Sequence, residues 1–186
     1  MAVVDGNDGV DLWDVTTDRL IAVLAKPDDG ADTVAFSPDG RMLAVDGLNG
    51  DTALWDVTNG HLMATLGGPS GSARMSLVFA PDGQVLAAAD AGMKTDVWNV
   101  TTGRLIATLT TPDFVDGVAF SPDGRVLAFG TANRRVDVWN VATGPLIATL
   151  TAPDGGAVSG VAFSPDSRTL AFVDDSDQAY LCSVSG

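Results

Sequence analysis

The sequence predicts an all-β protein built from repeats of a small four-stranded antiparallel sheet. Two aromatic residue types recur at almost the same interval. The phenylalanines that precede turns are 43, 41 and 43 residues apart: Phe36, Phe79, Phe120 and Phe163. The tryptophans are 42, 43 and 41 residues apart: Trp13, Trp55, Trp98 and Trp139. Periods of about 40–45 residues with four short strands each are typical of β-propeller blades.

One repeat, residues 117–150, explains the spacing. Its sequence is GVAFSPDGRVLAFGTANRRVDVWNVATGPLIATL. Two apolar runs flank the turn Ser121–Gly124, in which proline fixes φ and glycine supplies a positive φ. A second turn leads into the alternating strand VDVWNV, and a third leads into PLIATL. Four antiparallel strands result, and because both faces of so small a sheet are apolar, each sheet must pack on the next.

Two motifs in this repeat resemble the WD-repeat (WD40) β-propeller family. FSPDG occurs at Phe36 and Phe120, with FAPDG at Phe79 and FSPDS at Phe163. They alternate with LWDV at Trp13 and Trp55 and with VWNV at Trp98 and Trp139. The resemblance covers essentially the whole chain and implies WD40-type blades around a central channel, used as a binding platform. The chain is a divergent form, because it lacks the Gly-His dipeptide that many WD repeats carry before the first strand.

The repeats divide a single propeller domain, residues 1–186, into three whole blades and two partial terminal blades. We expect a partial blade at 1–24, whole blades at 33–66, 75–109 and 117–150, and a partial blade at 160–184. The expected strands number eighteen, with three in each partial blade and four in each whole one.

Three ways of completing the ring are open. The chain is a piece of a longer propeller, closes alone as a tight ring of about four or five blades, or pairs with a second copy in a larger ring. We favour a homo-oligomer through the incomplete terminal blades, since unpaired strand edges and apolar blade faces are association sites.

Composition narrows the class of protein. The net charge of −14 argues against nucleic acid as a partner, because a phosphate-binding surface needs clustered Lys and Arg. All 24 acidic residues are Asp, a turn former, so this acidic charge is expected in solvated turns. The one cysteine, Cys182, excludes an internal disulfide. Neither a signal peptide nor a membrane span is evident, so we expect a soluble, cytoplasmic protein without a membrane partner.

The tryptophans are expected to be structural residues that pack between blades at identical places. Cys182 takes the fifth tryptophan position. Each buried indole N–H needs an acceptor, because an unpaired donor costs about 1–3 kcal/mol. We predict that Asp5 accepts from Trp13, Asp90 from Trp98 and Thr131 from Trp139.

Two sets of turn residues bear on backbone conformation. Asn7, Asn49 and Asn133 take the turn-Asp position of the WD-repeat family, where a short amide tolerates the left-handed region. Ser167 stands where the other hairpins have glycine, which costs about 1 kcal/mol if that position is left-handed.

No catalytic, metal or cofactor site is expected. His61, the one histidine, is interpreted as a solvated turn residue, because no nucleophile or metal ligand accompanies it at a useful spacing. The candidate binding surface is a rim formed by turn tips, where apolar and arginine side chains are typical interface anchors. Its candidate residues are Phe114, Arg134, Arg135, Met93, Lys94, Leu48 and Arg74. The alternative is that the Phe114 side chain packs beneath its own loop and is buried there.

Two function classes therefore remain, with an enzyme a distant third. The favoured class is a non-catalytic protein–protein interaction scaffold that binds a protein or peptide on the rim through Phe114 and Arg134. The alternative is a purely structural module, either a self-assembling ring or the propeller fragment of a larger regulatory protein.

Overall fold

The computed structural model describes residues 2–4, 9–24, 31–47, 50–68, 74–90, 93–153 and 155–184. Within these ranges eighteen strands form five antiparallel sheets, and no residue is helical. Accordingly, this part of the chain contains no helix long and apolar enough to cross a membrane. The predicted all-β class is confirmed.

The five sheets follow one another in chain order. Sheet 1 comprises β1 (Ala2–Val4), β2 (Val10–Asp14) and β3 (Arg19–Leu24). Sheet 2 comprises β4 (Ala31–Phe36), β5 (Met42–Gly47), β6 (Thr52–Asp56) and β7 (Leu62–Leu66). Sheet 3 comprises β8 (Arg74–Phe79), β9 (Val85–Asp90), β10 (Lys94–Asn99) and β11 (Arg104–Thr110). Sheet 4 comprises β12 (Val115–Phe120), β13 (Val126–Thr131), β14 (Arg135–Asn140) and β15 (Leu146–Thr151). Sheet 5 comprises β16 (Val158–Phe163), β17 (Thr169–Asp174) and β18 (Ala179–Ser183).

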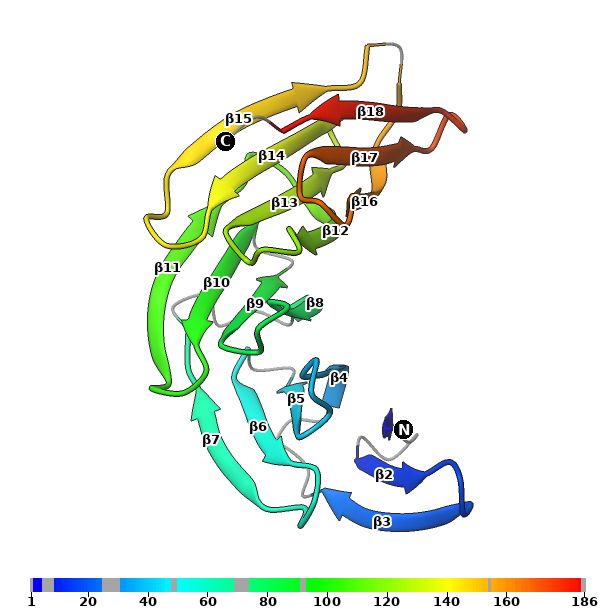
Figure 1. Ribbon diagram of the computed structural model, residues 1–186, viewed down its shortest axis with the longest axis vertical. Coiled ribbons are helices and arrows are strands. Elements are labelled where there is room, and N and C mark those ends of the chain that lie inside the picture. The colour runs from blue at the N-terminus through cyan, green and yellow to red at the C-terminus, as the bar shows by residue number, and fades with distance from the viewer. Residues whose placement is uncertain are drawn as a thin grey trace.

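The sheets stack side by side along an arc (Figure 1). The strands β4, β8, β12 and β16 line its inner side, and β3, β7, β11 and β15 run along its outer side. Each inner strand contacts the inner strand of the next sheet. Sheets 1 and 5 occupy the two ends of the arc, which is open between them (Figure 1).

The tryptophans occupy the same register position in successive sheets. Each third-strand indole lies opposite a leucine of the second strand: Trp55 opposite Leu43, Trp98 opposite Leu86 and Trp139 opposite Leu127. Cys182 lies opposite Leu170 in the same way. All four leucines are fully buried. A bulge at each of Trp13, Trp55, Trp98 and Trp139 shifts the pairing with the outer strand.

The alternation of side chains gives every sheet two faces with different neighbours. We call the face that carries the Trp or Cys182 position the backward face, because in sheets 2 to 5 it packs on the preceding sheet. The opposite, forward face packs on the following sheet. Trp98, for example, joins Leu54 and Leu66 of sheet 2, whereas its neighbour Val97 joins Leu127 and Phe129 of sheet 4. The core is therefore a series of four clusters between sheets.

The predicted acceptors for the indole N–H groups are wrong for Trp98 and Trp139. Trp98 donates to the main-chain carbonyl of Gly67, which follows β7 of the preceding sheet, at 3.3 Å. Asp90 lies four residues beyond Leu86, the partner of Trp98, and so about 13 Å away along the strand. Thr131 is equally far from Leu127, and its hydroxyl lies within hydrogen-bond distance of Asn133 Oδ1 at 2.9 Å and of the Arg135 carbonyl at 3.1 Å. The buried Nε1 atoms of Trp55 and Trp139 have no hydrogen-bond partner within the described residues. Asp5, the predicted acceptor for Trp13, lies outside those residues.

The left-handed turn position was also predicted one residue too early. In sheet 4 the residue with positive φ is Arg134, at 68°, and Asn133 accepts the hydroxyl of Thr131 instead. Gly50, Met93 and Asp177 occupy the same position in sheets 2, 3 and 5, with φ of 85°, 61° and 60°. Asn7 and Asn49 lie outside the described residues. Ser167 is left-handed as expected, at 60°.

Candidate partner-binding rim

One rim of the arc is formed by the turns between second and third strands and by the connections between sheets. We call it the Phe114 rim, comprising Met93 and residues 111–114, 132–134, 152–153, 155–157 and 175–178. Main-chain hydrogen bonds connect these segments. Thr111 N–H donates to the carbonyl of Met93 at 3.0 Å, and Ala132 N–H donates to that of Phe114 at 3.1 Å. Ala152 N–H donates to the carbonyl of Arg134 at 3.0 Å, so the turns of sheets 3 and 4 and the connections that follow them form one bonded surface.

Phe114 does not tuck under its own loop. Its side chain is 48% exposed, although Val115, the next residue, is buried. Its N–H donates to the carboxylate of Asp113 at 2.9 Å, and its carbonyl accepts from Ala132. The backbone is thus held at both polar groups while the ring faces solvent. Because the backbone is already held, the loop itself loses little conformational freedom when Phe114 binds a partner.

Two turn tips flank Phe114 and carry long side chains at left-handed positions. Met93 is 37% exposed and Arg134 is exposed. A non-glycine residue in this region costs about 1–2 kcal/mol, and Gly50 in sheet 2 shows that glycine is compatible with the same turn. The chain therefore presents the apolar side chain of Met93 and the cationic side chain of Arg134 at two positions where the positive φ favours glycine.

The side chain of Thr111 positions this surface and was not singled out from the sequence. This buried hydroxyl lies within hydrogen-bond distance of the Asp113 carbonyl at 2.8 Å and of the Met93 carbonyl at 3.2 Å. It therefore fastens the Phe114 loop to the Met93 turn. The only sequence signal is that threonine at 111 stands where the next sheet connection has Ala152, both directly before proline.

The remaining predicted rim residues lie elsewhere or are not described. Arg135 directs its guanidinium along the sheet, where Nη2 bonds the buried carboxylate of Asp137 at 3.1 Å and Thr149 Oγ1 at 3.0 Å. Lys94 is half-buried, and its N–H donates to Asp90 at 2.8 Å. Arg74 begins β8, and its side chain is outside the described part of the structure. Leu48 also lies outside it. Met93, Phe114 and Arg134 are the predicted residues that the structure brings together.

The opposite rim is built from self-contained turns. In the Ser-Pro-Asp turns the serine hydroxyl donates to the aspartate two residues later, at 2.6 Å in each case: Ser37 to Asp39, Ser121 to Asp123 and Ser164 to Asp166. This bond, followed by a main-chain N–H bond, lowers the pKa of each of these carboxyls. These carboxylates therefore stay ionised as solvated turn groups.

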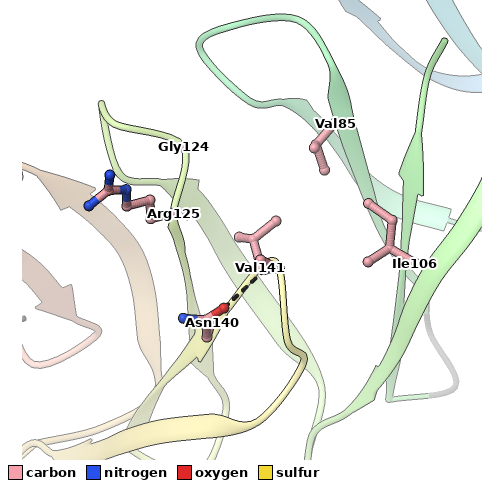
Figure 2. A pocket seen from close by; sticks show the side chains of 7 residues that line it. Val85, Ile106, Gly124, Arg125, Asn140 and Val141 are labelled. Atoms are coloured by element: carbon pink, nitrogen blue, oxygen red, sulfur yellow. Dashed lines mark hydrogen bonds between the residues drawn. The ribbon is translucent and has the colours of Figure 1, made fainter.

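A pocket of about 500 Å³ also lies on the opposite rim, between sheets 3 and 4. Figure 2 shows the side chains of Val85, Ile106 and Val141 around it, with the guanidinium of Arg125 directed away from them. Asn140 accepts from the N–H groups of Ala142 and Thr143. The Asn140 side chain therefore serves the turn, and the pocket is a gap between sheets 3 and 4 rather than a built ligand site.

No part of the described structure assembles a metal centre, since no three His, Cys, Asp or Glu side chains gather there.

The two rims of the arc differ in the side chains that they expose. The Phe114 rim offers exposed apolar and cationic groups on a bonded framework, which suits recognition of another molecule by contact.

Comparison with protein families agrees with this architecture. The WD40 family model, described as WD domain, G-beta repeat, matches residues 103–140 and 144–184. The chain contains WD40 repeats. Each matched repeat begins with the outer strand of one sheet and continues through three strands of the next, β11 to β14 and β15 to β18. WD40 repeats therefore connect adjacent sheets covalently here. No curated protein matches the chain.

Proposed function

We propose that this WD40-repeat chain is a non-catalytic scaffold that binds a protein or peptide on the Phe114 rim. WD40 repeats generally mediate protein–protein interactions, and WD40 domains are generally non-catalytic. The observation that carries the proposal is Phe114, which is about half exposed although its N–H donates to the Asp113 carboxylate and its carbonyl accepts from Ala132 N–H. It lies between the Met93 and Arg134 turns. Aromatic, methionine and arginine side chains are enriched in interface cores.

The chemistry of the rim defines the partner class. Phe114 and Met93 supply apolar area, and Arg134 supplies a cation that forms no ion pair within the described residues. A complementary segment would place an apolar side chain on Phe114 and a carboxylate near Arg134. Nucleic acid is disfavoured by the net charge of −14.

The test separates binding from folding. Phe114→Ala combined with Arg134→Gly removes both anchors, and glycine at 134 also relieves the left-handed strain. We expect a folded variant whose capture of partner proteins, measured by quantitative mass spectrometry of affinity-purified material, falls at least tenfold. Ser167→Gly, which relieves the same kind of strain on the opposite rim, should leave capture unchanged. Equal capture by the Phe114/Arg134 variant would reject the rim as the binding surface.

A self-assembling structural module is the second candidate. It is favoured by the forward face of sheet 5, where Leu181 is 78% exposed, whereas the equivalent residues of the preceding sheets are buried: Leu12, Leu54, Val97 and Val138. Apolar faces of this kind on repeat units are covered by a neighbouring unit. Association of the chain with itself would extend the arc, whereas partner binding would use its rim, so the two functions are compatible.

A further inference from the structure

The four sheet interfaces inside the chain follow one rule. In sheets 2, 3 and 4 the third strand directs one central apolar residue forward, where it joins the cluster shared with the following sheet: Leu54, Val97 and Val138. Leu12 of β2 holds the equivalent position in sheet 1, directly before the bulge at Trp13. All four are at most 2% exposed. The surface that covers each forward face is a backward face centred on Trp55, Trp98, Trp139 or Cys182.

Sheet 5 has the same forward face without a cover. Leu181 pairs with Ala171 as Val138 pairs with Ala128, and it is 78% exposed. Val173, in the adjacent position, is 45% exposed. A hollow of about 260 Å³ lies beside Val173, lined by Gly160, Val161, Ala162, Ala171 and Phe172. The surface is therefore apolar and indented.

Sheet 1 has the complementary surface, a backward face without a preceding sheet. Trp13 occupies the position that Trp98 and Trp139 occupy at covered interfaces. Val23 lies opposite Asp11 and is 64% exposed. The corresponding residues of sheets 3 and 4 are Thr108 and Thr149, which bond Asp96 and Asp137. At this outer-strand position sheet 1 is thus more apolar than sheets 3 and 4.

We propose that the forward face of sheet 5 binds the backward face of sheet 1 in a second copy of this chain. The inference rests on the self-assembling function above and specifies its interface. A backward face is the expected partner, because every forward face that is covered within the chain packs against the backward face of the next sheet. Within one chain, sheets 1 and 5 lie apart at the two ends of the arc, so these two faces would meet between copies (Figure 1).

Such an interface is head-to-tail, with a different surface contributed by each copy. It closes into a ring if the rotation permits and otherwise continues as an open chain of copies. Either arrangement leaves Met93, Phe114 and Arg134, which lie in or beside sheets 3 and 4, outside the contact. Each copy would therefore present these three side chains again.

The test uses two variants on the two exposed faces. Leu181→Asp places a carboxylate on the forward face of sheet 5, and Val23→Asp places one on the backward face of sheet 1. Because both native side chains are exposed, each variant should fold, as checked by far-ultraviolet circular dichroism. Each should raise the dissociation constant for self-association, measured by analytical ultracentrifugation, about 100-fold. Val15→Asp, at a 68% exposed turn residue, is the matched control and should assemble like the native chain.

Mixing the variants identifies the head-to-tail geometry. Leu181→Asp retains an intact sheet 1 face and Val23→Asp an intact sheet 5 face, so the mixture should form a dimer that grows no further. A native chain that stays monomeric at all concentrations, or a mixture that stays monomeric, would overturn the proposal. Partner capture through the Phe114 rim should be unchanged in both variants, so the failure of one proposal is distinguishable from the failure of the other.

Discussion

Sheets 4 and 5 have nearly the same first hairpin in two different surroundings. Both place Leu at the second-strand position opposite the Trp or Cys182 position, both bury a phenylalanine two residues later, and both close the first hairpin with a Ser-Pro-Asp turn. Yet Val138 is 2% exposed and its equivalent Leu181 is 78% exposed. The difference comes from the following sheet, which sheet 4 has and sheet 5 does not. Burial in this molecule is therefore a property of neighbouring sheets rather than of one repeat.

The largest expected effect tests this contrast directly. Val138→Asp places an unpaired carboxylate between sheets 4 and 5 and should lower the free energy of unfolding by about 4 kcal/mol or more. Leu181→Asp makes nearly the same change at the equivalent exposed position and should cost about 0.5 kcal/mol or less. Urea unfolding followed by tryptophan fluorescence, at concentrations where the chain is monomeric, measures both. Similar losses for the two variants would mean that sheet 5 is covered in solution.

A smaller effect is expected at the adjacent second-strand position. A Cβ atom on Gly130 would lie 2.7 Å from Cγ1 of Val158 and 3.0 Å from the Val158 carbonyl oxygen, so sheet 5 leaves no space for a side chain there. The equivalent residue of sheet 5 is Val173, which has no following sheet against it. Gly130→Val should therefore cost about 2–3 kcal/mol by overpacking. Val173→Gly should cost about 1 kcal/mol, the usual price of glycine within a strand. Equal costs would show that glycine at 130 is not required by the contact with Val158.

The sequence was informative where structure depends on local spacing. The positions of Trp and Phe predicted the four-stranded repeat, because residues at the same place in successive repeats take the same place in successive sheets. Trp55, Trp98 and Trp139 do occupy the same register position. The SPDG turns were predictable for the same reason, since their bonds join residues two apart. The position of Phe114 on a turn rim was predictable from strand order alone.

The sequence failed where the partner of a side chain is not fixed by local spacing. Asp90 was predicted to accept from Trp98 because both recur at fixed spacing, but the acceptor is a main-chain carbonyl at Gly67, which any residue could supply. Arg135 was assigned to the rim because it adjoins Arg134, whereas its strand position directs it to Asp137. Which of Arg134 and Arg135 reaches the rim depends on where the turn ends. The left-handed residue was predicted at Asn133, but it is Arg134, so the turn ends there and Arg135 begins β14.

The Ser-Pro-Asp turns offer a smaller test within the same pair of sheets. Gly124 ends the turn of sheet 4 with φ of 71°, and Ser167 holds the same position in sheet 5 with φ of 60°. Ser167→Gly should raise the free energy of unfolding by about 0.5–1 kcal/mol, because glycine adopts this conformation without a Cβ clash. The gain is reduced by loss of the Ser167 hydroxyl, which accepts from Asp123 N–H of sheet 4 at 3.3 Å. Thermal unfolding compared with Gly124→Ser, which should be destabilising, would reveal whether the position behaves alike in both sheets.

The smallest expected effect is a pKa change that should be equal in the two sheets. The Ser121 hydroxyl and then the Arg125 N–H lower the pKa of Asp123 below its ordinary 3.8, and Ser164 and Arg168 do the same for Asp166. Because these pKa values are lower in the folded protein, the stabilisation is complete above about pH 3.8 and is lost as the pH falls through the folded values. Ser121→Ala and Ser164→Ala should each raise the pKa of the neighbouring aspartate, as measured by carboxyl carbon NMR titration. Since every bond involved lies inside a single turn, the two increases should match even though the sheets are covered differently. A clearly smaller increase for Asp166 would show that even these local turns depend on the neighbouring sheet.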